Sequence, residues 1–245
     1  MSNIQWTGIT WNVTTGCTKV SAGCRSCYAE VMTRRLKGMG QVKYADGFNV
    51  IKMHAAELDR PATWTKPQLV FVDSMSDLFH DDVTLEFIKQ VFAVMVATPQ
   101  HTYQVLTKRI DRAMWFQSFL PWPDNVWLGT SVEDERVSNR IDALRVIQAK
   151  TRFLSLEPLI GPLPNLNLTG IDWVIVGGES GKMARPAELE WILSIIAQCR
   201  SAGVPVFVKQ MGSVLARQMK LSSAKGGEID EWPEHLRVRE MPFRL

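Results

Sequence analysis

Short apolar runs alternate along much of the chain with longer stretches whose apolar residues recur at helical spacing. Continuous runs rich in β-branched residues are typical of parallel strands that are buried on both faces, and the intervening stretches are typical of amphipathic helices. The expected strands are Leu69–Asp73, Tyr103–Leu106, Val126–Leu128, Phe153–Leu156, Trp173–Val176 and Pro205–Val208. The expected helices are Leu85–Val96, Ile110–Phe119, Val137–Ala149 and Glu188–Ala202.

An additional strand is expected at the start of the chain, over Trp6–Thr15, where large apolar residues alternate with small polar ones. Tyr28–Leu36 has helical spacing and is expected to end before Gly38. Residues 38–67 show no periodicity that assigns an element. With the first strand included, the chain contains about seven strand–helix units.

This alternation predicts an α/β fold. We expect a partial or complete (β/α) barrel of about six to seven parallel strands, rather than a doubly wound sheet. The expected barrel covers residues 1–215. Residues 216–245 are polar and basic and lack this alternation, so they are expected to form an appendage packed on the barrel, with a short strand near Leu236–Glu240.

Composition narrows the class of protein only slightly. The 245 residues are 46% hydrophobic and 22% charged with a net charge of +3, which is ordinary for a soluble globular protein. Four cysteines in a chain of this length do not form a disulfide scaffold. No basic segment followed by an apolar run begins the chain, and no apolar stretch is long enough to span a bilayer. We therefore expect a cytoplasmic protein without a membrane partner.

Three of the four cysteines, Cys17, Cys24 and Cys27, follow the first expected strand in the pattern C-x6-C-x2-C. Structural zinc takes four protein ligands, whereas a [4Fe–4S] cluster held by three cysteines keeps one iron open for another ligand. The four histidines show no zinc-finger spacing relative to these cysteines. The pattern favours a cluster site, and a structural zinc with a histidine ligand is the alternative.

Polar or charged residues follow nearly every expected strand. In a parallel barrel the carboxyl ends of the strands share one rim, where active sites assemble, and the cysteine loop would lie on the same rim. Any one of these residues can instead be a solvated helix cap, and their repetition is what favours a site. The strand-end residues are Asp73, Lys108, Glu133, Glu157, Glu179 and Lys209.

A cysteine triad after the first strand of a parallel barrel, ending in C-x2-C beside Tyr28, resembles the radical S-adenosylmethionine (SAM) superfamily. The resemblance implies that Cys17, Cys24 and Cys27 hold a [4Fe–4S] cluster, that SAM is the second cofactor and that a reductant such as flavodoxin or ferredoxin supplies an electron. The usual superfamily spacing is C-x3-C-x2-C, and its Gly-Gly-Glu motif normally follows the second strand. Here Gly177-Gly178-Glu179 follows the sixth expected strand.

The turn after the second strand reads instead Asp73-Ser74-Met75-Ser76-Asp77. Either this turn has taken over the role of the Gly-Gly-Glu motif, or the methionine end of SAM is held differently.

Over nearly its full length the chain also resembles a family of short phage and bacterial proteins marked by this three-cysteine loop. The stretches that carry this resemblance include TWNVTTGC, GCRSCYAE, DSMSDLFH, WVIVGGESG and EWPEHLRVRE. The family is similar to a compact branch of DNA photoproduct lyases, which implies repair of ultraviolet-induced pyrimidine dimers in DNA. The alternatives are a radical enzyme acting on another nucleobase or small substrate, and a zinc-stapled nucleic-acid-binding protein without catalysis.

The resemblance also implies that polar strand-end residues hold SAM. Carboxylates suit the ribose hydroxyls, and both Ser131 with Glu133 and Ser155 with Glu157 are open candidates for the ribose or methionine portion. Lys108, Arg109 and Lys209 are expected to bind either the cofactor carboxylate or substrate phosphates, and a solvated charge is the competing interpretation. The expected cofactor-binding residues are Asp73, Ser74, Ser76, Lys108, Ser131, Glu133, Ser155, Glu157, Gly177, Gly178, Glu179 and Lys209.

The resemblance also implies a hydrogen-atom donor, for which the candidates are Cys199 and a tyrosine, one of Tyr103, Tyr28 and Tyr44. Cys199 lies in an apolar helical stretch, where a cysteine is usually a small core residue, and that is the competing interpretation.

Overall fold

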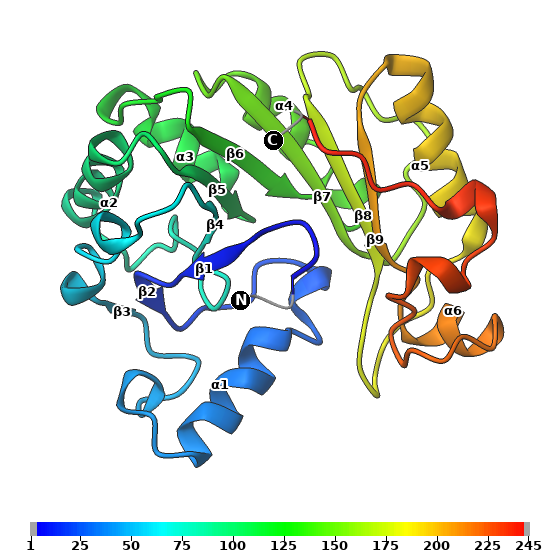
Figure 1. Cartoon of the computed structure of the whole chain (residues 1–245), viewed down its shortest axis with the longest axis horizontal. Coiled ribbons are helices and arrows are strands. Elements are labelled where there is room, and N and C mark those ends of the chain that lie inside the picture. Colours follow the sequence, from blue (N-terminus) through cyan, green and yellow to red (C-terminus); the bar gives the residue numbers. More distant parts are fainter. Residues whose placement is uncertain (1–3, 243–245) are drawn as a thin grey trace. The chain divides into compact units, whose positions relative to one another are not determined.

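The computed structural model describes residues 4–242, so the first three residues of the expected barrel and the last three of the expected appendage lie outside the described part (Figure 1). The strands are β1 (Ile9–Trp11), β2 (Thr14–Thr15), β3 (Lys52–Met53), β4 (Leu69–Val72), β5 (Thr102–Thr107), β6 (Val126–Ser131), β7 (Thr151–Leu159), β8 (Trp173–Gly178) and β9 (Val206–Gln210). The helices are α1 (Tyr28–Gly38), α2 (Leu85–Ala97), α3 (Ile110–Phe116), α4 (Arg140–Arg145), α5 (Leu189–Ala202) and α6 (Ser213–Gln218).

Seven parallel strands of the described chain form one sheet in the order β1-β4-β5-β6-β7-β8-β9. Each strand from β4 onward is followed in the sheet by the next strand of the sequence, which is the order of a (β/α) barrel. A doubly wound sheet would instead reverse its order at a switch point. Because β1 and β9 are the two ends of this order, the barrel is partial. The predicted fold class is confirmed.

The chain divides into two compact units. Unit 1 contains the described residues of 1–20, 27–129 and 146–151, and unit 2 contains those of 21–26, 130–145 and 152–245. The boundaries run through the cysteine loop, because Cys17 and Cys27 belong to unit 1 whereas Cys24 belongs to unit 2.

Within unit 1, the apolar runs form buried strands as their composition predicts. Val70 of β4 and Val105 of β5 are fully buried. Helix α2 is capped by Thr84, which precedes its first residue. The Thr84 hydroxyl accepts a hydrogen bond from the amide of Phe87 and so satisfies one free N–H of the first turn. Its buried face carries residues at helical spacing: Phe87, Ile88, Val91, Phe92 and Met95. The expected helix over Leu85–Val96 is confirmed.

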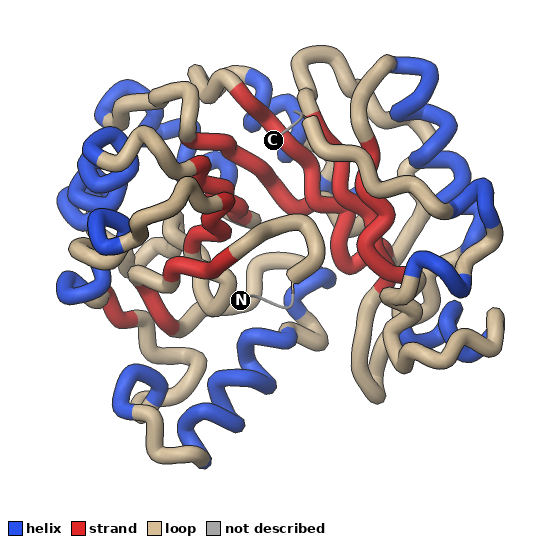
Figure 2. The backbone as a smooth tube through the Cα atoms, in the orientation of Figure 1, coloured by secondary structure: helices blue, strands red, loops and turns tan. Residues whose placement is uncertain are grey.

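The expected first strand over Trp6–Thr15 is interrupted. Only β1 joins the parallel sheet, and β2 turns away to pair antiparallel with β3, which lies in the stretch without assignable periodicity. The buried Trp11 side chain also turns to this stretch, because its ring N–H donates to the carbonyl of Glu57 at 2.8 Å. Figure 2 shows that this stretch is mostly loop. Its short elements depend on contacts with the first strands, which local periodicity does not encode.

Within unit 2, β8 is buried at every position, and helix α5 contacts it. Helix α5 ends at Gly203, whose φ of 67° is the left-handed conformation that closes many helices. The expected helix over Val137–Ala149 is largely wrong, since α4 covers only Arg140–Arg145. No described helix combines the length and the apolar character that a bilayer crossing requires.

The segment after α6 covers the outer edge of β9. The amide of Val208 donates to the carbonyl of Val238 at 2.8 Å, and the amide of Glu240 donates to the carbonyl of Val206 at 3.0 Å. An exposed strand edge is prone to pairing with other chains, and these contacts remove that exposure. The short strand expected near Leu236–Glu240 is a single antiparallel bridge between Phe207 and Arg239.

Gly178 allows the end of β8 to pack tightly on the segment after β9. A Cβ placed at Gly178 would lie 2.3 Å from the carbonyl oxygen of Met211 and 2.9 Å from the Cα of Gly212. Both atoms belong to the backbone, which cannot move aside as a flexible side chain can. The absence of a side chain at this position is therefore a packing requirement within unit 2.

We predict that Gly178→Ala lowers the free energy of unfolding by about 2 kcal/mol, the usual cost of overpacking a buried site. Gly38→Ala is the matched control, because a Cβ there meets no atom within 4 Å and alanine favours helix α1 by at most about 1 kcal/mol. Urea unfolding of both variants measures the difference. Equal stability of the two variants would contradict the packing argument.

Candidate functional site

The three cysteines of the loop are chemically available. Cys17, Cys24 and Cys27 are each partly exposed, and none forms a disulfide. Cys27 immediately precedes helix α1, and Cys24 ends a short 3-10 turn over Ala22–Cys24. Two neighbouring groups lie near Cys17 Sγ: the carbonyl of Thr18 at 3.5 Å and the guanidinium of Arg109 at 3.6 Å. A positive charge beside a thiol favours the thiolate, which is the form that binds metals.

Within unit 1, Arg109 fixes the start of the cysteine loop. Its Nη2 donates to both the carbonyl oxygen and the hydroxyl of Thr18, at 3.0 and 2.8 Å. The guanidinium is buried and pairs with the buried carboxylate of Asp77 at 3.4 Å. Asp77 accepts further hydrogen bonds from the Thr107 hydroxyl at 2.7 Å and the Lys108 amide at 3.1 Å. The turn after β4 and the end of β5 thus hold the residue next to Cys17.

His80 contacts the same residue. Its Nδ1 accepts a hydrogen bond from the amide of Asp82 at 3.1 Å, so the ring proton lies on Nε2, which donates to the Thr18 hydroxyl at 2.8 Å. Burial and the charge of Arg109 lower the pKa of His80, which keeps the imidazole neutral. Both ring nitrogens are engaged, so His80 is not available to complete a zinc site.

The turn Asp73–Asp77, one of the two options for the role of the Gly-Gly-Glu motif, forms hydrogen bonds with residues that precede the cysteine loop. The Ser74 hydroxyl donates to Asn12 Oδ1 at 3.1 Å, and the Ser76 hydroxyl donates to the carbonyl of Gly16 at 2.5 Å. Gly16 cannot carry a side chain, because its φ is +85° and a Cβ would lie 2.1 Å from the carbonyl oxygen of Val50. The turn is therefore joined to the residue before Cys17.

Asp73 is the most perturbed carboxyl of this turn. It is fully enclosed and accepts hydrogen bonds from the Thr14 amide at 2.9 Å and the Thr14 hydroxyl at 2.8 Å. Burial raises the pKa of Asp73 to about 7, and the two bonds from Thr14 offset only part of this effect. Its φ of 55° is left-handed, a conformation that Asp and Asn adopt more readily than other side chains.

Within unit 2, Glu133 lies under the Ser21–Cys24 turn. The carboxylate is buried, pairs with Arg140 Nη1 at 3.0 Å and accepts a short hydrogen bond from the Ser21 hydroxyl. A Cβ at Gly23 would lie 2.3 Å from Glu133 Oε1, so this glycine leaves room for the carboxylate. The carbonyl of Ser131 accepts from the same Arg140 at 2.8 Å. This pair supports the turn that carries Cys24.

Glu179, the acid of the Gly-Gly-Glu sequence, forms the second charged pair that reaches this turn. Its carboxylate accepts from Arg185 N at 2.8 Å, Nε at 2.9 Å and Nη2 at 2.5 Å. Arg185 Nη1 donates to the carbonyl of Ala22 at 2.9 Å. Burial raises the pKa of Glu179, but the hydrogen bonds and charge of Arg185 outweigh this and lower it overall. Glu179 is therefore an ionised group that orients Arg185.

Two other expected cofactor ligands pair with each other. Lys209 Nζ lies 3.0 Å from Glu157 Oε2, and a Cβ at Gly177 would lie 2.6 Å from Glu157 Oε1. Glu157 is part of β7 rather than following it. Ser155, further back in β7, is buried, and its carbonyl accepts from the amide of Val132. Gly177 and Gly178 thus accommodate side chain and backbone within unit 2, which explains both glycines without a ligand.

Neither Cys199 nor Tyr103 reaches the surface, whereas Tyr28 is exposed. Cys199 is fully buried in α5, and burial raises the pKa of its thiol to about 12. Tyr103 is fully buried in β5, and its hydroxyl lies 2.6 Å from the hydroxyl of Thr98. Both residues lie in the core, whereas a hydrogen-atom donor must contact its substrate. The position of Cys199 agrees with its competing interpretation as a small core residue.

The side chains of the cysteine loop fit the expected [4Fe–4S] cluster in the chemistry of their ligand atoms. The loop offers three thiols outside any disulfide, and thiolates are the protein ligands of [4Fe–4S] clusters. In the part of the chain that the structure describes, no group of three or more His, Cys, Asp or Glu side chains is arranged to hold a metal ion. That the strand-end residues bind SAM stays a prediction.

Four residues without a distinctive sequence pattern take part in the contacts that hold the cysteine loop. They are Thr18 within the loop, and His80, Arg140 and Arg185 outside it. No spacing or periodicity distinguishes them from surface residues, because each partner is distant in the sequence or lies in an irregular loop. Arg109 is expected from the sequence to bind the cofactor carboxylate or substrate phosphates, and in the structure its guanidinium contacts Thr18 and Asp77.

We predict that Asp77→Asn lowers the free energy of unfolding by about 3 kcal/mol, because it leaves the buried guanidinium of Arg109 without its counter-charge. Asp81→Asn is the matched control: Asp81 also faces Arg109, at 3.8 Å, but its side chain is 76% exposed. An exposed pair contributes within about 0.5 kcal/mol. If urea unfolding gave the same loss for both variants, Asp77 would not be the group that neutralises Arg109.

We predict that Asp73 makes stability depend on pH. The carboxyl titrates near 7 in the folded chain and near 3.8 when unfolded, so the folded state binds the extra proton between these values. Stability then falls as pH rises from 5 to 8, with about 3 kcal/mol from this group. Asp73→Asn, which retains the shape, should remove this part of the decline. An unchanged difference between unfolding free energies at pH 5 and pH 8 would contradict the prediction.

No curated protein and no solved structure matches the chain. One family model, described as a protein of unknown function (DUF5131), matches residues 1–235. Because this match covers nearly the whole sequence, the chain belongs to the DUF5131 family.

Proposed function

We propose that this protein is a radical SAM enzyme whose [4Fe–4S] cluster is held by Cys17, Cys24 and Cys27. The observation that carries the proposal is the three-thiol loop itself, together with the buried charged pairs that fix its backbone. Catalytic constellations need such support, because a loosely held ligand set does not position a reactive group. When bound, the cluster and SAM supply one-electron chemistry that removes a hydrogen atom from the substrate.

The residues of the chain have distinct parts in this proposal. Arg109 stabilises the thiolate of Cys17 and holds Thr18 in place. Arg185 and Glu133 hold the turn that carries Cys24. Among the described strand-end charges, Glu157, Lys209 and Lys108 are partly exposed, and the ion-paired Glu157 and Lys209 are the candidates for polar contacts with SAM.

The proposed substrate is a pyrimidine dimer in DNA, as the family resemblance implies. Exposed aromatic side chains stack on unpaired bases, and Trp115 of α3 is 77% exposed. Trp127 is buried and Trp122 is partly buried against Phe92, so both offer less ring surface than Trp115. A lesion in duplex DNA must be flipped out of the stack, which costs less where stacking is already damaged.

We predict that anaerobically prepared protein is brown, that it cleaves SAM when reduced and that it then removes dimers from ultraviolet-irradiated DNA. Replacement of any loop cysteine by alanine should abolish the colour and the cleavage, because a three-ligand site loses one corner. Cys199→Ala is the control, since it removes a buried thiol outside the loop and should leave both intact.

The possible results separate the alternatives. Metal analysis that finds zinc with no iron overturns the enzyme proposal and favours the zinc-stapled binding protein. Cleavage of SAM without loss of dimers retains the radical chemistry but rejects the lyase, in favour of another nucleobase or a small substrate.

A further inference from the structure

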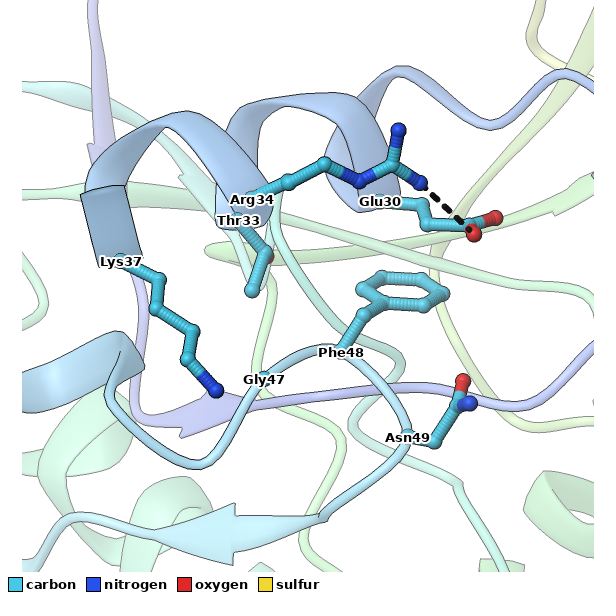
Figure 3. Close-up of a pocket in the computed structure, with 7 residues that line it drawn as sticks. All are labelled: Glu30, Thr33, Arg34, Lys37, Gly47, Phe48 and Asn49. Atoms are coloured by element: carbon cyan, nitrogen blue, oxygen red, sulfur yellow. Dashed lines mark ion pairs between the residues drawn. The ribbon is translucent and has the colours of Figure 1, made fainter.

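Unit 1 carries a pocket between α1 and the loop over residues 47–49, outside the contacts described above (Figure 3). Helix α1 contributes Glu30, Thr33, Arg34 and Lys37, and the loop contributes Phe48 and Asn49. Figure 3 shows the side chains of Thr33 and Lys37 directed from the helix toward the loop. The pocket thus brings together an aromatic ring, an amide, a hydroxyl and two cationic groups.

The hydroxyl of Thr33 is buried without a hydrogen-bond partner in the described part of the chain, which indicates that the pocket can hold a ligand. Thr33 is 1% exposed, and its Oγ1 has no hydrogen-bond partner among the described residues. A threonine within a helix commonly bonds to the carbonyl of the preceding turn, and a buried hydroxyl without any partner is unfavourable. Because Thr33 lines the pocket, a molecule that enters it and displaces part of the lining over this enclosed oxygen can supply the missing hydrogen bond.

The charges of the pocket favour an anion. The one acid, Glu30, is paired with Lys19 at 3.1 Å and with Arg34 at 3.6 Å. The Arg34 side chain is 76% exposed, and Lys37 is also exposed. Guanidinium and ammonium groups that remain accessible beside a neutralised acid suit a phosphate.

We propose that this pocket binds a nucleotide, with the base against Phe48 and the phosphate between Arg34 and Lys37. Phe48 is half-buried, which leaves part of the ring for stacking, and base–aromatic stacking is favourable for every base. The Asn49 amide and the Thr33 hydroxyl offer both donors and acceptors to the edge of a base or to a sugar hydroxyl. The ligand is either a free nucleotide or one unit of a nucleic-acid strand.

The pocket is joined to the cysteine loop through the backbone of unit 1. The amide of Cys17 donates to the carbonyl of Phe48 at 2.8 Å, and helix α1 begins directly after Cys27. A nucleotide in the pocket would therefore contact the two segments that adjoin these cysteines. The inference goes beyond the proposed function, because the pocket would bind a nucleotide whatever reaction the loop supports.

Calorimetric titration of the full-length protein tests the proposal with three probes: thymidine monophosphate, a short oligothymidylate and inorganic phosphate. We expect the double variant Arg34→Gln/Lys37→Gln to bind the nucleotide probe about tenfold or more weakly, as loss of charged hydrogen bonds implies. Thr33→Val, which removes only the hydroxyl, should weaken binding about threefold to tenfold. Arg35→Gln is the matched control, because Arg35 is exposed on the same helix but does not line the pocket.

Each outcome decides the proposal. Binding of the monophosphate with this order of variants supports a free nucleotide, and binding of the oligothymidylate alone with the same order supports a strand. Phosphate bound as tightly as the nucleotide probe overturns the proposal, since the pocket would then be an anion site. No binding of any probe, or equal effects of all variants including Arg35→Gln, overturns it as well. The titration needs no catalytic turnover, so its failure leaves the proposed function standing.

Discussion

Around the cysteine loop, the described ionised side chains are buried only where each is paired with a side chain of opposite charge. An isolated ion in a protein interior is very unfavourable, so each buried strand-end carboxylate must find a counter-charge or become neutral. Asp77 meets Arg109, Glu133 meets Arg140 and Glu179 meets Arg185. In each unit, an arginine or its partner carboxylate also contacts the backbone or a hydroxyl of the cysteine loop. The same groups therefore satisfy an electrostatic constraint and define the path of the loop.

In this arrangement most strand-end residues have structural contacts, whereas their positions in the sequence suggest contacts with a ligand. A rim of polar side chains at the carboxyl ends of parallel strands is the usual place for ligand contacts. Here most of the expected cofactor ligands already hold protein groups: Ser76 holds Gly16, Glu133 holds the turn of Cys24 and Glu179 orients Arg185. These contacts fix the backbone of the loop that carries the three thiols, and that the same residues bind SAM stays a prediction.

The outcome of prediction differed between elements for physical reasons. The strand runs and helices α2 and α5 were found because apolar periodicity reflects burial of one element at a time. The expected helix over Val137–Ala149 is shortened to Arg140–Arg145, and its first residue is buried in an ion pair with Glu133, a contact that periodicity does not report. No element could be predicted in the irregular stretch 38–67, because its strand β3 depends on pairing with β2 and not on a local pattern.

The sequence by itself determined the α/β class, the sequential order of strands and the identity of the thiol loop, because buried runs and cysteine spacing are local properties of the chain. Only the tertiary structure decided that Asp73 is enclosed against Thr14, that Gly178 packs on backbone and that Cys199 and Tyr103 are core residues. It also decided which arginine meets which carboxylate. These outcomes depend on distance and burial between residues far apart in the chain, and such pair properties leave no periodic signal.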